Sequence, residues 1–166
     1  MWNLWFVTAA AAADIGGSWA LVSKAEARRA IDAAVSRSAS SFPKSRQSMV
    51  RSRLSSIPRL CRDLVFRLDA TELAWRCGTK KRELVVPLAK LGTPFEVKGD
   101  NGPAMATVTF ADGRVRARFQ TDEGSRFVEF AFDDANLVVT EQFRSDRLQV
   151  PLQWQVAYAR STSTEE

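Results

Sequence analysis

The order of secondary-structure signals constrains this chain more than any other feature, because a strand and two helices are followed only by strands. Residues 17–22 alternate as a short strand, and helical spacing then extends from Ser23, which can cap a helix, to about Ile57. From Leu60 to Arg160 apolar residues alternate with polar ones, and turn residues recur about every eight to twelve positions. Such a chain builds an antiparallel sheet that must close or stack to hide its apolar face.

Length and composition fit one globular domain. The chain has 166 residues, of which 45% are hydrophobic and 26% charged, enough for a full core. We predict a single domain at residues 14–160, of the α+β class but mainly β, and a disordered tail at residues 161–166.

The first thirteen residues have the character of a signal peptide. Residues 2–7 are mostly apolar, and alanines occupy residues 9–13 just before Asp14. The stretch is too short to span a bilayer. We therefore expect a periplasmic or secreted protein. No Lys or Arg precedes the apolar run, so the alternative is an N-terminal helix that packs on the body of a cytoplasmic protein.

The chain has two cysteines, and whether they form a disulfide depends on the redox state of the cellular compartment. Cys61 is predicted to begin one strand and Cys77 to end the next, with the turn at residues 69–72. This pairing puts Leu64 opposite Cys77, so a bridge requires a bulge or a twist. In an oxidising compartment we still expect a disulfide between them. The chain has no histidine and the cysteine spacing is not that of a zinc knuckle, so no metal site is expected.

The helical segment is strongly basic. Residues 24–59 hold nine lysines and arginines against two acidic residues, a net charge of +7 in a chain of net charge +5. Such a surface can meet nucleic acid, anionic lipid or an acidic protein, or it can be a solvated helix face. Nucleic acid is not expected, because the predicted arginine-rich strand lacks exposed aromatic partners for stacking. The candidate surface for a transient anionic membrane or a partner is Arg46, Arg51 and Arg53.

Two apolar stripes define the helices. Pro43 separates them and Pro58 follows the second, which is expected from about Lys44 to Ser56. The predicted buried side chains are Ala27, Ala30, Ile31, Ala34, Val35 and Phe42 on the first helix and Met49, Val50, Leu54 and Ile57 on the second. These modest stripes suit helices that lie on a sheet face or a barrel mouth.

The C-terminal strands alternate most clearly. Val115, Ala117 and Phe119 are predicted to point inward and the arginines between them outward. Asp112-Gly113 is a hairpin turn. The same alternation predicts an inward face of Leu152, Trp154, Val156 and Tyr158. In all we expect about ten strands in up-and-down order.

This order of elements resembles the calycin barrels, and among them the fatty-acid-binding proteins more than the lipocalins. The segment Gly17-Ser18-Trp19 is similar to the opening Gly-x-Trp strand of that family, and two helices follow the first strand in both. The resemblance implies a calycin-like up-and-down barrel that binds a lipid, with helices over its entrance. The family's Arg-x-Tyr carboxylate clamp appears here only in reverse order, as Tyr158-Ala159-Arg160. We expect Trp19 to plug one end of the barrel.

Candidate ligand-binding residues follow from strand parity. Glu141 shares parity with Phe143, and Tyr158 and Arg160 share parity with Trp154, so all five would face the interior. Glu141, Tyr158 and Arg160 could form an inner ion pair capped by a phenol, or could bind a polar headgroup; alternatively, Glu141 simply pairs with an arginine. The candidate site is Glu141, Tyr158, Arg160, Trp154, Phe119 and Phe143.

An enzyme is not expected. The chain has no histidine for proton transfer, no G-x-S-x-G elbow and no glycine-rich phosphate loop. We predict a monomer without a cofactor that binds a hydrophobic small molecule or lipid inside the barrel. The alternative is a structural or protein-interaction module with a filled barrel, which would contact partners through its basic helices or its arginine-rich strand. A large interior void would favour the ligand, and a filled core the alternative.

Overall fold

The computed structural model describes residues 14–78, 82–99 and 102–162 of the chain. One strand, β1 (Gly17–Leu21), precedes two helices, α1 (Lys24–Ser40) and α2 (Lys44–Leu54). Nine strands and a short 3₁₀ turn follow: β2 (Asp63–Leu68), β3 (Glu72–Cys77), β4 (Leu84–Pro87), η1 (Leu88–Lys90), β5 (Phe95–Gly99), β6 (Gly102–Ala111), β7 (Arg114–Thr121), β8 (Gly124–Phe132), β9 (Asn136–Arg144) and β10 (Leu152–Arg160). The predicted α+β order of one strand, two helices and a strand meander is confirmed.

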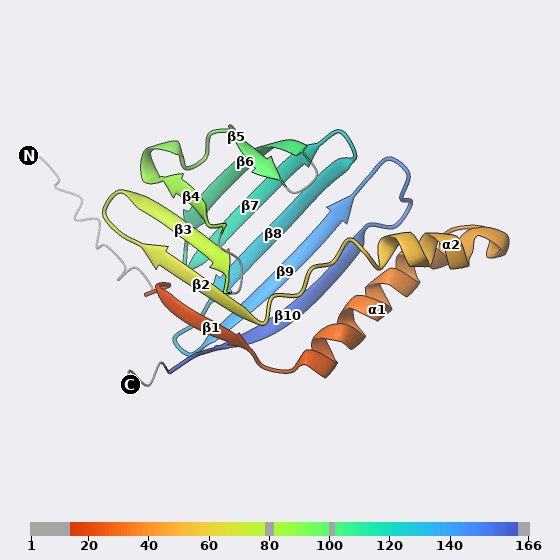
Figure 1. The fold of residues 1–166 in the computed structure, drawn as a ribbon, viewed down its shortest axis with the longest axis horizontal. Helices are drawn as coiled ribbons and strands as arrows, with labels where there is room; N and C mark the ends of the chain where they lie inside the picture. Colours follow the sequence, from red (N-terminus) through yellow and green to blue (C-terminus); the bar gives the residue numbers. More distant parts are fainter. Residues whose placement is uncertain (1–13, 79–81, 100–101, 163–166) are drawn as a thin grey trace, which may run out of the picture.

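All ten strands form one antiparallel sheet, in the order β4-β3-β2-β1-β10-β9-β8-β7-β6-β5. The strands β4 and β5 are therefore its two edges and are not hydrogen-bonded to each other. The sheet curls strongly, and β1–β3 cross the direction of β6–β10 at a steep angle (Figure 1). The result is a calycin-like half-barrel in which one face of the sheet is turned inward.

Aromatic side chains hold the two arms of this curl together. The ring of Phe66 on β2 packs edge-on against Phe130 and Phe132 on β8, with ring centroids 5.0 and 4.9 Å apart. Trp75 on β3 contacts Phe130 at 5.6 Å. Edge-to-face pairs of this kind add stability beyond the apolar area that they bury. Side chains therefore fill the part of the interior that lies between β2–β3 and β8.

Trp19 completes this aromatic cluster. Its side chain is fully buried, and its ring meets Phe132 edge-on at 5.4 Å. The guanidinium of Arg160, which lies opposite Trp19 on β10, is 4.4 Å from the ring centroid. The indole nitrogen donates to the carbonyl of Ile15 at 3.3 Å, so its polar group is satisfied inside the core.

Helix α1 covers an edge that the sheet itself leaves open. β1 pairs only with Tyr158, Ala159 and Arg160 of β10, so the first half of β10 has no strand on that side. α1 runs beside it (Figure 1), and Nη2 of Arg37 donates to the carbonyl of Gln153 at 3.3 Å. Ser23 caps the helix by accepting a hydrogen bond from the amide of Glu26, as expected.

The second helix is less buried than its apolar stripe predicts. α2 packs on α1 and ends at Leu54, its one buried residue. Met49, predicted as buried, is 51% exposed, and Val50 is partly exposed. The prediction was wrong for Met49 because α2 extends beyond α1 and away from the sheet (Figure 1), so only one side of it meets the body.

The predicted register of the hairpin that contains the two cysteines is confirmed, but its first strand begins later than predicted. Leu64 lies opposite Cys77, but β2 begins at Asp63 and not at Cys61. The hairpin turn is closed by Asp69, whose carboxylate accepts hydrogen bonds from the amides of Thr71 and Glu72. These hydrogen bonds lower the pKa of Asp69 to about 2.

The position of Trp19 gives a prediction for stability. Trp19→Ala should lower the free energy of unfolding by about 3–5 kcal/mol, because it leaves a cavity where the two arms of the sheet meet. Val22→Ala is the control, since Val22 is 57% exposed and should change stability by about 0.5 kcal/mol or less. Urea unfolding of the three proteins measures both values. An unchanged midpoint for Trp19→Ala would contradict the role given to this side chain.

Candidate functional site

The inner face of the sheet ends in a row of mostly apolar side chains, which we call the terminal row. In register from β5 to β10 its members are Phe95, Ala106, Phe119, Arg126, Phe143 and Leu152. Phe95, Phe119 and Phe143 are only partly buried, although alternation places them on the inner face. The terminal row lies at the end of β6–β10 opposite to the aromatic cluster, so apolar surface remains accessible there.

An ion pair between a partly exposed arginine and a buried carboxylate lies in and beside this row. Arg126 on β8 donates through Nε to Oε2 of Glu141 on β9 at 2.9 Å, and its Nη2 donates to the same oxygen. Glu141 is only 9% exposed and lies opposite Val128 on one side and Trp154 on the other. Burial raises the pKa of Glu141, and the charge of Arg126 opposes that rise.

Tyr158 lies further along β10, towards the aromatic cluster. Its hydroxyl donates to the carbonyl of Cys61 at 2.9 Å, which ties the segment after α2 to the inner face. Burial, followed by the negative charges of Glu141 and Asp63, raises the pKa of Tyr158 well above its usual value. The phenol therefore stays protonated and acts as a donor.

Arg160 is engaged elsewhere. Its Nη1 donates to the carbonyl of Gly16 at 2.8 Å and its Nε to the carbonyl of Asp134 at 3.3 Å, while its guanidinium covers Trp19. The predicted inner arrangement of Glu141, Tyr158 and Arg160 is thus not formed as an ion pair capped by a phenol. The alternative partner for Glu141, another arginine, is the one that the structure shows.

The structure therefore brings together part of the predicted site. Glu141, Trp154, Phe119 and Phe143 lie close to one another around Arg126, whereas Arg160 lies at the other end of β10. Sequence reasoning missed Arg126. The signal was present, because Arg126 shares parity with Val128 and Phe130 on β8.

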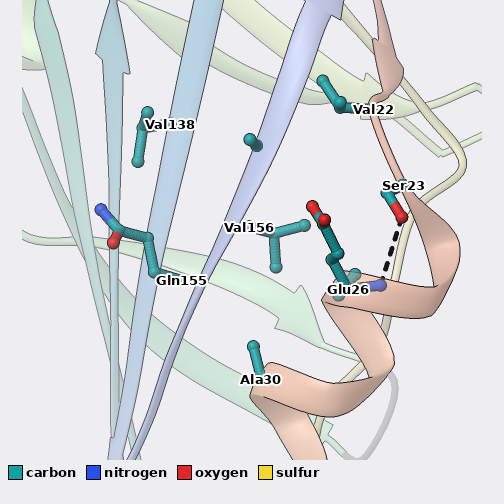
Figure 2. A pocket seen from close by; sticks show the side chains of 9 residues that line it. Val22, Ser23, Glu26, Ala30, Val138, Gln155 and Val156 are labelled. Carbon is teal, nitrogen blue, oxygen red and sulfur yellow. Dashed lines mark hydrogen bonds between the residues drawn. The ribbon is translucent and has the colours of Figure 1, made fainter.

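Two open pockets of the described residues lie away from the terminal row. One of about 310 Å³ lies between the start of α1 and β10, where Glu26 points towards Val156 and Val22 and Ala30 form part of the wall (Figure 2). The other, of about 290 Å³, is lined by Asp14, Phe132, Asp133, Asp134 and Arg160.

Three further observations concern the described residues. Cys61 and Cys77 are joined by a disulfide with their Cα atoms 5.5 Å apart, and it fixes the start of β2 to the end of β3. Within the described ranges, no three His, Cys, Asp or Glu side chains gather where they could hold a metal ion. None of the helices in that part of the chain is long and apolar enough to cross a bilayer.

Comparison with solved structures identifies the fold. A Schistosoma mansoni fatty acid binding protein in complex with arachidonic acid matches with a TM-score of 0.55 and 12% identity, over 89% of this chain and 96% of that one. The fold is that of the fatty-acid-binding proteins. Human cRBP IV matches with a TM-score of 0.52 and 12% identity, over 90% and 99% of the two chains.

The same fold also occurs in a protein named for another property. An abundant heat soluble (SAHS) protein of Ramazzottius varieornatus matches with a TM-score of 0.55 and 14% identity, over 89% and 95% of the two chains. Comparisons with protein-family models and with curated protein sequences find no match. The similarity is therefore one of fold, and the function has to be argued from the residues of this chain.

Proposed function

We propose that this protein binds a hydrophobic small molecule or lipid on the inner face of its half-barrel and catalyses no reaction. The observation that carries the proposal is the terminal row, where Phe95, Phe119 and Phe143 stay partly exposed on a concave face. A concave apolar surface with a few polar groups is the usual form of a small-molecule site. Arg126 and Glu141 supply those polar groups.

The comparisons support binding over catalysis. Structures of the same fold include a fatty acid binding protein holding arachidonic acid and a protein described as a fatty acid transporter. The sequence of this chain contains no histidine, the commonest general acid or base near neutral pH.

A second function is favoured by the aromatic side chains that fill part of the interior. The cluster of Trp19, Phe66, Trp75, Phe130 and Phe132 occupies space that a large ligand would need. On this second proposal the chain is a structural or interaction module, and its basic helices or its arginine-rich strand β7 make the contacts. Binding of a short-chain ligand would favour the first function over the second. A short chain is the suitable probe, because the aromatic cluster leaves the terminal row as the place where the ligand can lie.

We also propose that the protein works outside the cytoplasm, as a periplasmic or secreted monomer. The expected signal peptide at residues 1–13 lies outside the described residues. The Cys61–Cys77 disulfide supports this proposal, because such bonds persist in oxidising compartments.

The ligand-binding proposal is tested with 1-dodecanol and dodecanoate in isothermal titration calorimetry. At least one should bind, and the double variant Phe119→Ser/Phe143→Ser should weaken binding about tenfold or more, because each phenylalanine buries apolar area against the ligand. Phe127→Ser is the matched control, since Phe127 lies on the opposite face of β8. Absence of binding by the wild type, or an equal loss in the control, would contradict the proposal.

We propose in addition that α2 docks transiently on anionic membranes to load or release the ligand. Arg46, Arg51 and Arg53 are all exposed, and α2 has no acidic residue in its first turn or elsewhere. Each such side chain near an anionic surface contributes about 1 kcal/mol, which suffices for weak, salt-sensitive binding.

Vesicle co-sedimentation tests this docking. Wild-type protein should bind vesicles containing phosphatidylserine at low salt and leave them at high salt, and the triple Arg→Gln variant of Arg46, Arg51 and Arg53 should not bind. The control carries Arg→Gln at Arg114, Arg116 and Arg118 on β7, which removes the same charge from the exposed face of the sheet. Equal binding to neutral vesicles, or an equal effect of both triple variants, would contradict docking through α2.

A further inference from the structure

The charges on the inner face are few. In the described strands, only three charged side chains occupy inward positions: Arg126 on β8, Glu141 on β9 and Arg160 on β10. A ligand headgroup on the inner face of the described strands would meet these three charges.

Each of the two arginines already has a partner for its charge or its donors among the described residues. Arg160 is held by Gly16, Asp134 and the ring of Trp19, at the end of β10 far from the terminal row. Arg126 lies in the terminal row between Phe119 and Phe143, but its Nε and Nη2 both donate to Oε2 of Glu141. Glu141 thus pairs with the one cationic side chain that the described strands place in the terminal row.

This pairing disfavours an anionic ligand. A carboxylate that approached Arg126 would also approach the buried charge of Glu141, and displacing Glu141 would leave that charge without a partner. A ligand hydroxyl group is uncharged, so it can approach without repulsion from Glu141 and without displacing Glu141 from Arg126. Both hydrogen bonds that Glu141 accepts from described residues end on Oε2, so Oε1 remains as an acceptor for a ligand donor.

We propose that Glu141 is a specificity-determining residue that makes the inner face select uncharged amphiphiles with a hydroxyl or amide donor over their anionic counterparts. This inference rests on the proposed function, since it assumes that the apolar part of the ligand lies along the terminal row. The ligand class is then that of long-chain alcohols, acylglycerols and similar neutral lipids.

Paired ligands test the inference. Wild-type protein should bind 1-dodecanol at least tenfold more tightly than dodecanoate at pH 7.5, since the two differ only in the headgroup. Glu141→Gln should improve dodecanoate binding about tenfold or more and leave dodecanol binding little changed, because Arg126 then meets a neutral amide. Glu129→Gln is the control: Glu129 pairs with Arg114 and Arg116 on the outer face, so this change removes the same charge without altering the preference.

A double variant separates specificity from folding. Arg126→Gln/Glu141→Gln has no inner cation in the terminal row, so it should lose the gain in dodecanoate binding while its circular dichroism and dodecanol binding persist. A wild-type preference for dodecanoate, or a ratio that Glu141→Gln does not change, overturns the inference and leaves the proposed function standing. Absence of binding for both ligands overturns the proposed function and the inference with it.

Discussion

The contact between Phe66 and the pair Phe130 and Phe132 is the interaction on which the rest of the structure depends. It joins β2 to β8 across the interior, between strands that are four neighbours apart in the sheet. The apolar area buried in that contact stabilises the curled form of the sheet. Without it, the apolar face of the sheet would be exposed to water. Trp19 and Trp75 extend the same packing to β1 and β3.

This packing divides the inner face into two parts with different properties. Near the aromatic cluster Trp19, Phe66 and Phe130 are buried, Trp75 and Phe132 pack against them, and the guanidinium of Arg160 covers the ring of Trp19. At the terminal row the aromatic side chains remain partly exposed and surround the Arg126–Glu141 pair. A filled interior and a ligand site are therefore compatible in one half-barrel, provided that the ligand is small or lies mainly along the open end.

Alternation along each strand predicted the faces but not the partners across strands. It placed Leu152, Trp154, Val156 and Tyr158 inward correctly, because the period of two is fixed by backbone geometry. It could not give Arg126 as the partner of Glu141, since that depends on the register of β8 against β9. The prediction that Met49 is buried was wrong for a related reason. An apolar stripe along a helix does not indicate how far the helix extends beyond the helix that it packs on.

The central claim is that the inner face carries a hydrophobic molecule. Native mass spectrometry of the protein purified from its own host, followed by lipid analysis of the denatured sample, tests this claim most directly. We expect one bound molecule of lipid size per chain, recovered as a neutral amphiphile after denaturation. A bare polypeptide mass under gentle conditions, with no lipid in the extract, would contradict it and favour the filled interaction module.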